Sequence, residues 1–274
     1  MSDTGKSRAE IFRQLHAAGR FLVLANAWDA GSARLIESCG APAIATTSAG
    51  LSWSHGYPDG NALPPRVLAS AVAEIARAIS VPLSVDFEAG YSSDPAQVAD
   101  GIGPVLDAGA VGINLEDGSE SPNLLCAKIS ALKAAAARRG VDLFVNARCD
   151  VYLRRLVTPE RALAETLARG KRYLEAGADG LFVPGLADAT ALRAIAESIA
   201  LPLNAMLVPG LPPAAELRAL GVRRLSAGSA ITQTIYGVAK RAARQLLEEG
   251  RADLLLERTL THPELNALFS ALRS

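Results

Sequence analysis

The chain has 274 residues, half of them apolar, and its 28 basic side chains are balanced by 28 acidic ones. A chain of this length can bury the core of one α/β barrel or of two smaller domains. The zero net charge argues against a nucleic-acid partner, which normally requires a basic excess. No apolar run reaches membrane-spanning length, the N-terminus lacks a signal-peptide core, and three scattered cysteines favour a reduced, cytoplasmic compartment.

A unit repeats along the chain: a helical pattern, a glycine that ends it, and a short apolar run. The segments 106–113 and 174–181 show it most clearly. Because glycine adopts the left-handed conformation easily, it ends the helix and lets the chain turn directly into a strand. The predicted strands cover 20–26, 42–48, 81–87, 111–116, 141–148, 178–184, 201–207 and 222–227. The predicted helices cover 29–39, 64–79, 94–108, 124–139, 158–176, 188–199 and 212–220, and a further segment, 229–249, follows the last strand.

The predicted strands are continuous apolar runs, which is typical of parallel strands covered by helices on both faces. Eight strand–helix units in this length predict a (β/α)₈ barrel. A doubly wound open sheet is the alternative, since periodicity alone does not exclude it. We expect one domain over 1–274, with 250–274 as a C-terminal helical extension. The tail from 252 to 274 is amphipathic, so it either packs on its own barrel or forms an oligomer contact.

Acidic side chains stand where predicted strands end. Asp86 and Glu88 are two residues apart on an extended segment, so they point to one face. Two neighbouring carboxylates repel each other, and the pair therefore favours a bound cation or a shared proton. Glu116 and Asp117 end the next strand in the same way. An acid at a strand end can also be the N-cap of the following helix, but several acids at the mouth of one barrel predict a Mg²⁺ site.

Further polar side chains end other predicted strands, among them Thr47, Ser48 and Arg148. A Mg²⁺ site of this kind suits a substrate with a carboxylate next to a carbonyl, because the metal binds both oxygens and stabilises an enolate. Arg148 then binds a carboxylate or developing negative charge, or else forms a structural ion pair with Glu116. Thr47 and Ser48 either hold a carboxylate oxygen or only shape a turn.

Two other kinds of side chain invite a catalytic role. His55 is a possible general acid or base, although a lone loop histidine is more often structural. Cys126 and Cys149 have no histidine close to them in the sequence, so we expect both thiols to be inert packing groups.

Taken together, these stretches resemble the isocitrate lyase/phosphoenolpyruvate mutase superfamily. The likeness covers roughly residues 10–248. It rests on 26–34 (NAWDAGSAR), 56–59 (GYPD), 85–91 (VDFEAGY), 113–117 (INLED), 146–148 (NAR), 175–180 (EAGADG) and 220–222 (LGV).

The resemblance implies a (β/α)₈ barrel whose last helix is commonly exchanged between subunits, homodimers or homotetramers, and Mg²⁺ or Mn²⁺ as the cofactor. By position, Asp86 resembles the direct metal ligand, and the acids that act largely through bound water are Asp59, Glu88 and Glu116. Arg148 resembles the arginine that faces the substrate, with Glu116 and Asp59 beside it as catalytic residues. The turn that resembles a carboxylate cradle comprises Thr46, Thr47, Ser48 and Ala49, and Asn204 is a weaker substrate-binding match.

Departures from the family pattern bear on the reaction. The usual Asp-x-Asp is Asp86-Phe87-Glu88 here, and the longer glutamate still reaches an outer-sphere water. The lyases carry a Lys-(Lys/Arg)-Cys-Gly-His loop whose cysteine is the acid, but the segment 118–126 lacks that glycine and histidine, so Cys126 is not assigned the role. Pro184-Gly185 replaces a lyase glutamate, and only Asn123 resembles the gate loop of the mutases.

The sequence therefore predicts a Mg²⁺-dependent lyase-type enzyme. Its substrate is expected to be a small 2-oxo or 2-hydroxy di- or tricarboxylate in which a C–C bond next to a carboxylate is made or broken through an enolate. Hydrolytic or decarboxylating cleavage is a close variant. Two alternatives stay open: P–C bond chemistry on phosphonopyruvate-like compounds, and a non-catalytic binder of 2-oxo acids.

Overall fold

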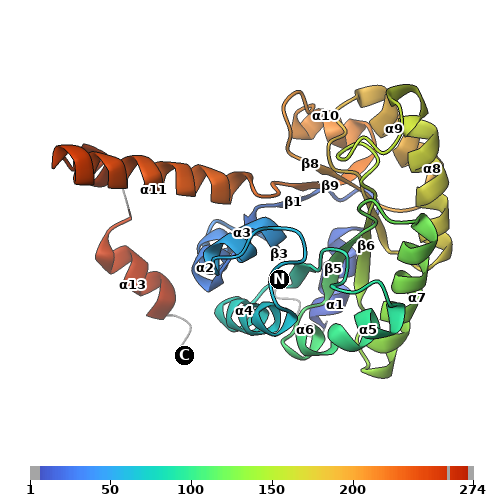
Figure 1. The fold of residues 1–274 in the computed structure, drawn as a ribbon, viewed down its shortest axis with the longest axis horizontal. Coiled ribbons are helices and arrows are strands. Elements are labelled where there is room, and N and C mark those ends of the chain that lie inside the picture. Colours follow the sequence, from blue (N-terminus) through green and yellow to red (C-terminus); the bar gives the residue numbers. More distant parts are fainter. Residues whose placement is uncertain (1–6, 258–259, 271–274) are drawn as a thin grey trace.

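The computed structural model describes residues 7–257 and 260–270, and in these ranges short parallel strands curl into a barrel that is surrounded by helices (Figure 1). The strands are β1 (Leu22–Leu24), β2 (Asn26–Ala27), β3 (Ile44–Thr46), β4 (Leu83–Asp86), β5 (Gly112–Glu116), β6 (Phe144–Arg148), β7 (Gly180–Phe182), β8 (Leu203–Met206) and β9 (Val222–Ser226). Only Ala25 separates β1 from β2; β1 pairs with β9 and β2 pairs with β3, so this divided first strand closes the ring. The predicted (β/α)₈ barrel is confirmed.

Helices connect the strands in the predicted order. They are α1 (Arg8–Leu15), α2 (Ala30–Ser38), α3 (Ser48–Ser54), α4 (Pro65–Ala78), α5 (Pro95–Gly101), α6 (Gly103–Asp107), α7 (Pro122–Arg138), α8 (Pro159–Glu175), α9 (Ala189–Ser198), α10 (Ala214–Ala219), α11 (Ala230–Glu249), α12 (Asp253–Leu256) and α13 (His262–Ser270). The helix predicted over 94–108 is divided at Ile102 because Pro104 has no N–H to donate and its ring crowds the preceding turn. None of the described helices is long and apolar enough to cross a membrane.

Helix α1, which the repeat analysis missed, closes the N-terminal end of the barrel. A capping box of Ser7 and Glu10 begins the helix, and this pattern in the sequence could have predicted its start. Phe12 is fully buried, and its ring meets the edge of Phe144 at 5.4 Å between centroids. His16 stacks on Phe144 at 4.2 Å. Side chains therefore fill the N-terminal end of the barrel.

The C-terminal part leaves the barrel. Helix α11 projects away from the strands, and the chain returns as α13 (Figure 1). Arg34 of α2 donates from Nε to the Leu268 carbonyl at 3.1 Å, so α13 contacts its own barrel. Leu265 and Phe269 nevertheless remain 38% exposed. The tail therefore packs only partly on its own chain; its residues 258–259 and 271–274, including Leu272, lie outside the described residues.

Candidate active site

A cavity of about 220 Å³ opens at the carboxyl ends of the strands. Strand register brings its walls together: Asp86 lies opposite Asn114 in the β4–β5 pair, and Arg148 lies opposite Phe182 in the β6–β7 pair. The residues that line the cavity are Asn26, Thr47, Ser48, Ala49, Asp59, Asp86, Asn114, Arg148, Leu153, Phe182, Met206, Ser226, Gly228 and Ser229. The structure thus brings most of the predicted site residues to one place.

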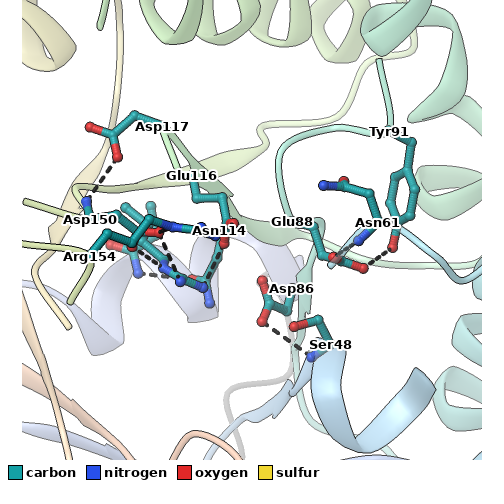
Figure 2. A network of polar contacts seen from close by, with 12 residues as sticks. Ser48, Asn61, Asp86, Glu88, Tyr91, Asn114, Glu116, Asp117, Asp150 and Arg154 are labelled. Carbon is teal, nitrogen blue, oxygen red and sulfur yellow. Dashed lines mark hydrogen bonds and ion pairs between the residues drawn. The ribbon is translucent and has the colours of Figure 1, made fainter. Parts of the chain in front are cut away.

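Asp86 stands between the two polar clusters of the site (Figure 2). Its Oδ2 accepts a hydrogen bond of 3.2 Å from the Ser48 N–H, while Oδ1 is buried and has no partner among the described residues. Burial raises the pKa of this carboxyl group, although the charge of Arg148 works against the rise. A buried carboxylate oxygen without a partner is costly, and hard cations such as Mg²⁺ bind to oxygens of this kind.

Glu88 anchors a loop instead of facing the cavity. Its Oε1 accepts a bond of 2.9 Å from the Tyr91 hydroxyl, and its Oε2 accepts one from the Asn61 N–H. Burial raises the pKa of Glu88. The backbone of all three residues is left-handed, with φ of 50° at Glu88, 61° at Tyr91 and 60° at Asn61. Such conformations are costly for residues other than glycine and often occur at functional sites.

The loop that Glu88 anchors carries Asp59. This residue lies between α3 and α4, is exposed, and lines the cavity. Its charge contributes to the raised pKa of Asp86, so the two carboxylates are electrostatic neighbours. Within 7–257 and 260–270, however, no three His, Cys, Asp or Glu side chains are grouped closely enough to hold a metal directly. A metal held by Asp86 would therefore complete its coordination largely with water and substrate.

Arg148 belongs to a cluster of two arginines and two acids on the other side of Asp86. Its Nη1 lies 2.6 Å from Glu116 Oε2, and its Nε lies 2.6 Å from Asp150 Oδ1. Arg154 joins the same acids, at 2.8 Å from Asp150 and 3.5 Å from Glu116. Burial raises the pKa of Glu116 to about 7, although Arg148 opposes the shift. The ion pair considered as an alternative for Arg148 is present, and the same side chain also lines the cavity.

Asp117, the other acid at the end of β5, turns away from the cavity. Its Oδ2 accepts bonds from the Tyr173 hydroxyl at 2.6 Å and from Arg169 Nη1 at 2.8 Å. Its Oδ1 accepts a bond of 2.8 Å from the Asp150 N–H. Asp117 therefore fixes the segment that carries Asp150, which in turn holds Arg148.

The predicted turn over 46–49 is a strand end followed at once by a helix. Thr47 is the N-cap of α3, and its own N–H donates to the Ala27 carbonyl at 3.0 Å. Thr46 is fully buried, and its hydroxyl oxygen accepts a bond of 2.8 Å from the Asp86 N–H. Of the four predicted cradle residues, Thr47, Ser48 and Ala49 line the cavity and Thr46 supports Asp86 from behind.

Asn204 lies below the cavity and does not line it. Its Oδ1 accepts a bond of 3.0 Å from Asn146 Nδ2, and Asn146 also donates to Asn114 Oδ1 at 2.9 Å. A register irregularity between Leu203 and Asn204 accompanies this arrangement. The three asparagines form a buried polar layer in which only Asn114 reaches the cavity.

Arg224 adds a positive charge to this layer. It is fully buried, its Nη1 has no partner among the described residues, and its Nη2 lies 3.4 Å from Asn114 Oδ1. Burial lowers the pKa of Arg224 to about 9. Neither Arg224 nor Asn114 was predicted, although Asn114 is two residues before Glu116 and so shares its face of the strand.

The predicted histidine and cysteine positions lie outside the cavity lining. His55 ends α3, and its Nδ1 lies 2.9 Å from the Leu51 carbonyl. Cys126 contacts the Arg172 carbonyl through Sγ at 3.6 Å, and Cys149 is fully buried. Burial raises the pKa of both thiols, which disfavours the reactive thiolate.

Fold and site together define a barrel protein with a charged, ligand-sized cavity at the carboxyl ends of its strands. The family model described as phosphoenolpyruvate phosphomutase matches residues 12–247, and the chain belongs to this family within the isocitrate lyase/phosphoenolpyruvate mutase superfamily. The resemblance drawn from the sequence is thereby confirmed.

Relatives and solved structures agree with this assignment. An uncharacterized protein of Mycobacterium tuberculosis (strain ATCC 25618 / H37Rv) is 38% identical over 93% of this chain and 95% of that protein. Oxaloacetate decarboxylase of Paraburkholderia xenovorans (strain LB400) is 30% identical over 86% of this chain and 80% of that protein. A crystal structure from Burkholderia cenocepacia J2315 matches with a TM-score of 0.83 and 41% identity over 88% of this chain and 100% of that chain. The fold is also that of a phosphonopyruvate hydrolase in complex with oxalate and Mg²⁺, with a TM-score of 0.83 and 24% identity over 98% and 96% of the two chains.

Proposed function

We propose that this chain is a Mg²⁺-dependent lyase-type enzyme. It would make or break a C–C bond next to a carboxylate in a small 2-oxo or 2-hydroxy di- or tricarboxylate. The observation that carries the proposal is the buried Oδ1 of Asp86, which has no partner among the described residues and lies at the cavity that Arg148 also lines. A cation ligand and a carboxylate-binding arginine in one small cavity suit a metal-held keto acid. The relative with oxalate and Mg²⁺ supports the same ligand chemistry, with Mn²⁺ as the other candidate metal.

Asp86 would hold the metal directly, and Asp59 and Glu116 would act through water. Glu88, which was predicted for the same role, would instead hold the loop that carries Asp59, because its two oxygens accept bonds from Asn61 and Tyr91. Mg²⁺ held by Asp86 would supply Lewis acidity next to the 2-oxygen of the acid. Arg148 would bind a substrate carboxylate, and its double attachment to Glu116 and Asp150 fixes the guanidinium before the substrate arrives.

The cradle would receive the other carboxylate oxygens. Thr47, Ser48 and Ala49 line the cavity where α3 begins, so hydroxyl and N–H donors are available there. Thr46 would support this turn, and Asn204 would contribute through Asn146 and Asn114 rather than by direct contact.

The remaining predictions about the whole molecule belong to the same proposal. Residues 1–274 would form one barrel domain with 250–274 as its extension, in a cytoplasmic homodimer or homotetramer. Exposed apolar side chains on the projecting helix α11, including Ile235, Val238 and Leu247, support contact with a second subunit.

One panel experiment tests the function. The protein is incubated with Mg²⁺ and with 2-oxo acids, 2-hydroxy diacids or phosphonopyruvate, while melting temperature and NMR-detected products are followed. We expect Mg²⁺-dependent stabilisation and C–C cleavage or condensation products. Phosphate or phosphoenolpyruvate release would favour P–C chemistry, and stabilisation without turnover would favour a non-catalytic binder. Asp86→Asn should abolish the response, whereas Asp100→Asn, which changes an exposed acid on α5, should not.

A further inference from the structure

The cavity has two chemically different halves. The strands β4, β5 and β6 supply Asp86, Asn114 and Arg148, and the start of α3 supplies hydroxyl groups. Next to Arg148, three apolar side chains line the cavity: Phe182 from β7, Met206 from β8 and Leu153 from the loop after β6. We call these three side chains the apolar wall. The uncharged residues Asn26, Ser226 and Ser229 also line the cavity.

Two glycines pack closely against residues of the apolar wall. Gly185 has a φ of 82°, and a Cβ there would lie 3.0 Å from the backbone N and Cα of Leu153. Gly228 has a φ of 60°, and a Cβ there would lie 2.9 Å from Met206 Sδ. A larger residue at either position would displace the wall, because such contacts are closer than packed atoms tolerate.

Charge is confined to the polar half. Among the described residues that line the cavity, Arg148 is the one cation, and its guanidinium carbon stands 6.0 Å from the centre of the Phe182 ring. Arg148 therefore marks the border between the halves. A carboxylate placed against the apolar wall would lose water and gain no cation, which is strongly unfavourable. An alkyl group there would instead be removed from water at a gain.

Resting on the proposed function, we infer that the substrate carries a short alkyl group, not a carboxylate, on the side of its 2-oxo or 2-hydroxy acid unit that meets the apolar wall. Leu153, Phe182 and Met206 are then specificity-determining residues. A second carboxylate of the substrate would have to point out of the cavity toward solvent. The cavity thus selects acids that carry an alkyl group at this position over acids that carry a carboxylate there.

Calorimetric titration in the presence of Mg²⁺ measures this preference directly. The ligands are oxalate, which has no side group, then pyruvate, 2-oxobutyrate and 2-oxovalerate, and finally 2-oxoglutarate, which carries a carboxylate at the end of its chain. Kd should fall about fourfold for each added methylene until the wall is covered. The Kd of 2-oxoglutarate should exceed that of 2-oxovalerate by at least tenfold.

Two leucines provide a matched pair of variants. Leu153 is 43% exposed and lines the cavity, whereas Leu207 is 54% exposed and does not. Leu153→Ala should reduce the advantage of 2-oxovalerate over pyruvate at least threefold and leave oxalate binding unchanged. Leu207→Ala should leave every ratio unchanged.

The outcomes distinguish failure of the apolar-wall inference from failure of the proposed function. If oxalate and pyruvate bind but 2-oxoglutarate binds more tightly than 2-oxovalerate, the apolar wall does not set specificity and this inference is overturned. An unchanged ratio in Leu153→Ala overturns it as well. If none of the acids binds in the presence of Mg²⁺, the proposed function fails and the inference falls with it.

Discussion

Replacing Asp86 by asparagine separates metal binding from the structural role of this side chain. Asparagine keeps an oxygen that accepts a hydrogen bond from the Ser48 N–H. Its neutral NH₂ group replaces Oδ1, which has no partner in the part of the chain that the structure describes. Without metal, the wild-type fold buries a charged oxygen, and this burial raises the pKa of Asp86. The asparagine amide nitrogen has no new partner at that position, so a burial cost of about 1–3 kcal/mol applies to both proteins, and the difference between them comes from the lost charge. The free energy of unfolding of metal-free Asp86→Asn should therefore equal or exceed that of the wild type, by up to about 2 kcal/mol.

The same variant should lose all ligand-dependent stabilisation. With Mg²⁺ and oxalate at a hundred times the Kd, the wild type should gain about 2.7 kcal/mol, because ligands that bind only the folded state stabilise it by mass action. Urea denaturation followed by circular dichroism, with and without Mg²⁺ and oxalate, measures both effects. The reasoning is refuted if metal-free Asp86→Asn is less stable than the wild type by more than 2 kcal/mol, or if it keeps the ligand-dependent gain. Asp100→Asn should behave as the wild type in both titrations.

Two further predictions concern the surroundings of Asp86, and a third concerns His16 at the N-terminal end of the barrel. Arg148→Lys should weaken Mg²⁺-dependent oxalate binding about ten- to hundredfold in calorimetry, since lysine cannot reproduce the forked contacts to Asp150 and Glu116; an unchanged Kd would remove Arg148 from the binding site. Tyr91→Phe should lower the free energy of unfolding by about 1–3 kcal/mol, because it removes a donor to a buried carboxylate, and urea denaturation that shows no loss would contradict the anchoring role. Burial and the charge of Arg224 lower the pKa of His16 from 6.5 to about 3, so its contribution to stability is complete above pH 6.5 and is lost as the pH falls toward 3. Unfolding at pH 7 and pH 5 should differ by about 2 kcal/mol more in the wild type than in His16→Leu, and equal pH dependence would show that His16 is not the titrating group.

The strands were predictable because strands that are buried on both faces are almost entirely apolar in sequence. All eight apolar runs contain a strand, and a left-handed glycine ends five of the seven predicted helical patterns, at positions 40, 109, 140, 177 and 221. The short helix α3 was not predicted from the sequence. It is made largely of small residues and is buried, and a sequence without an apolar stripe gives no helical periodicity.

The site was predictable where side-chain position follows from strand position. Asp86 and Arg148 end their strands, so the barrel geometry alone brings them to one cavity. Glu88 shows where this argument stops: its left-handed backbone breaks the strand alternation and turns the carboxylate toward Asn61 and Tyr91. Leu153 lies in a loop held by a close approach to Gly185, a long-range contact that the local sequence does not encode.

Binding of Mn²⁺ followed by electron paramagnetic resonance tests the central claim, that Asp86 and Arg148 form one metal and carboxylate site. We expect one Mn²⁺ per chain in the presence of oxalate, with several exchangeable water ligands because only Asp86 binds directly, and loss of this signal in Asp86→Asn. Binding of Mn²⁺ that survives Asp86→Asn, or an ion without coordinated water, would contradict the account.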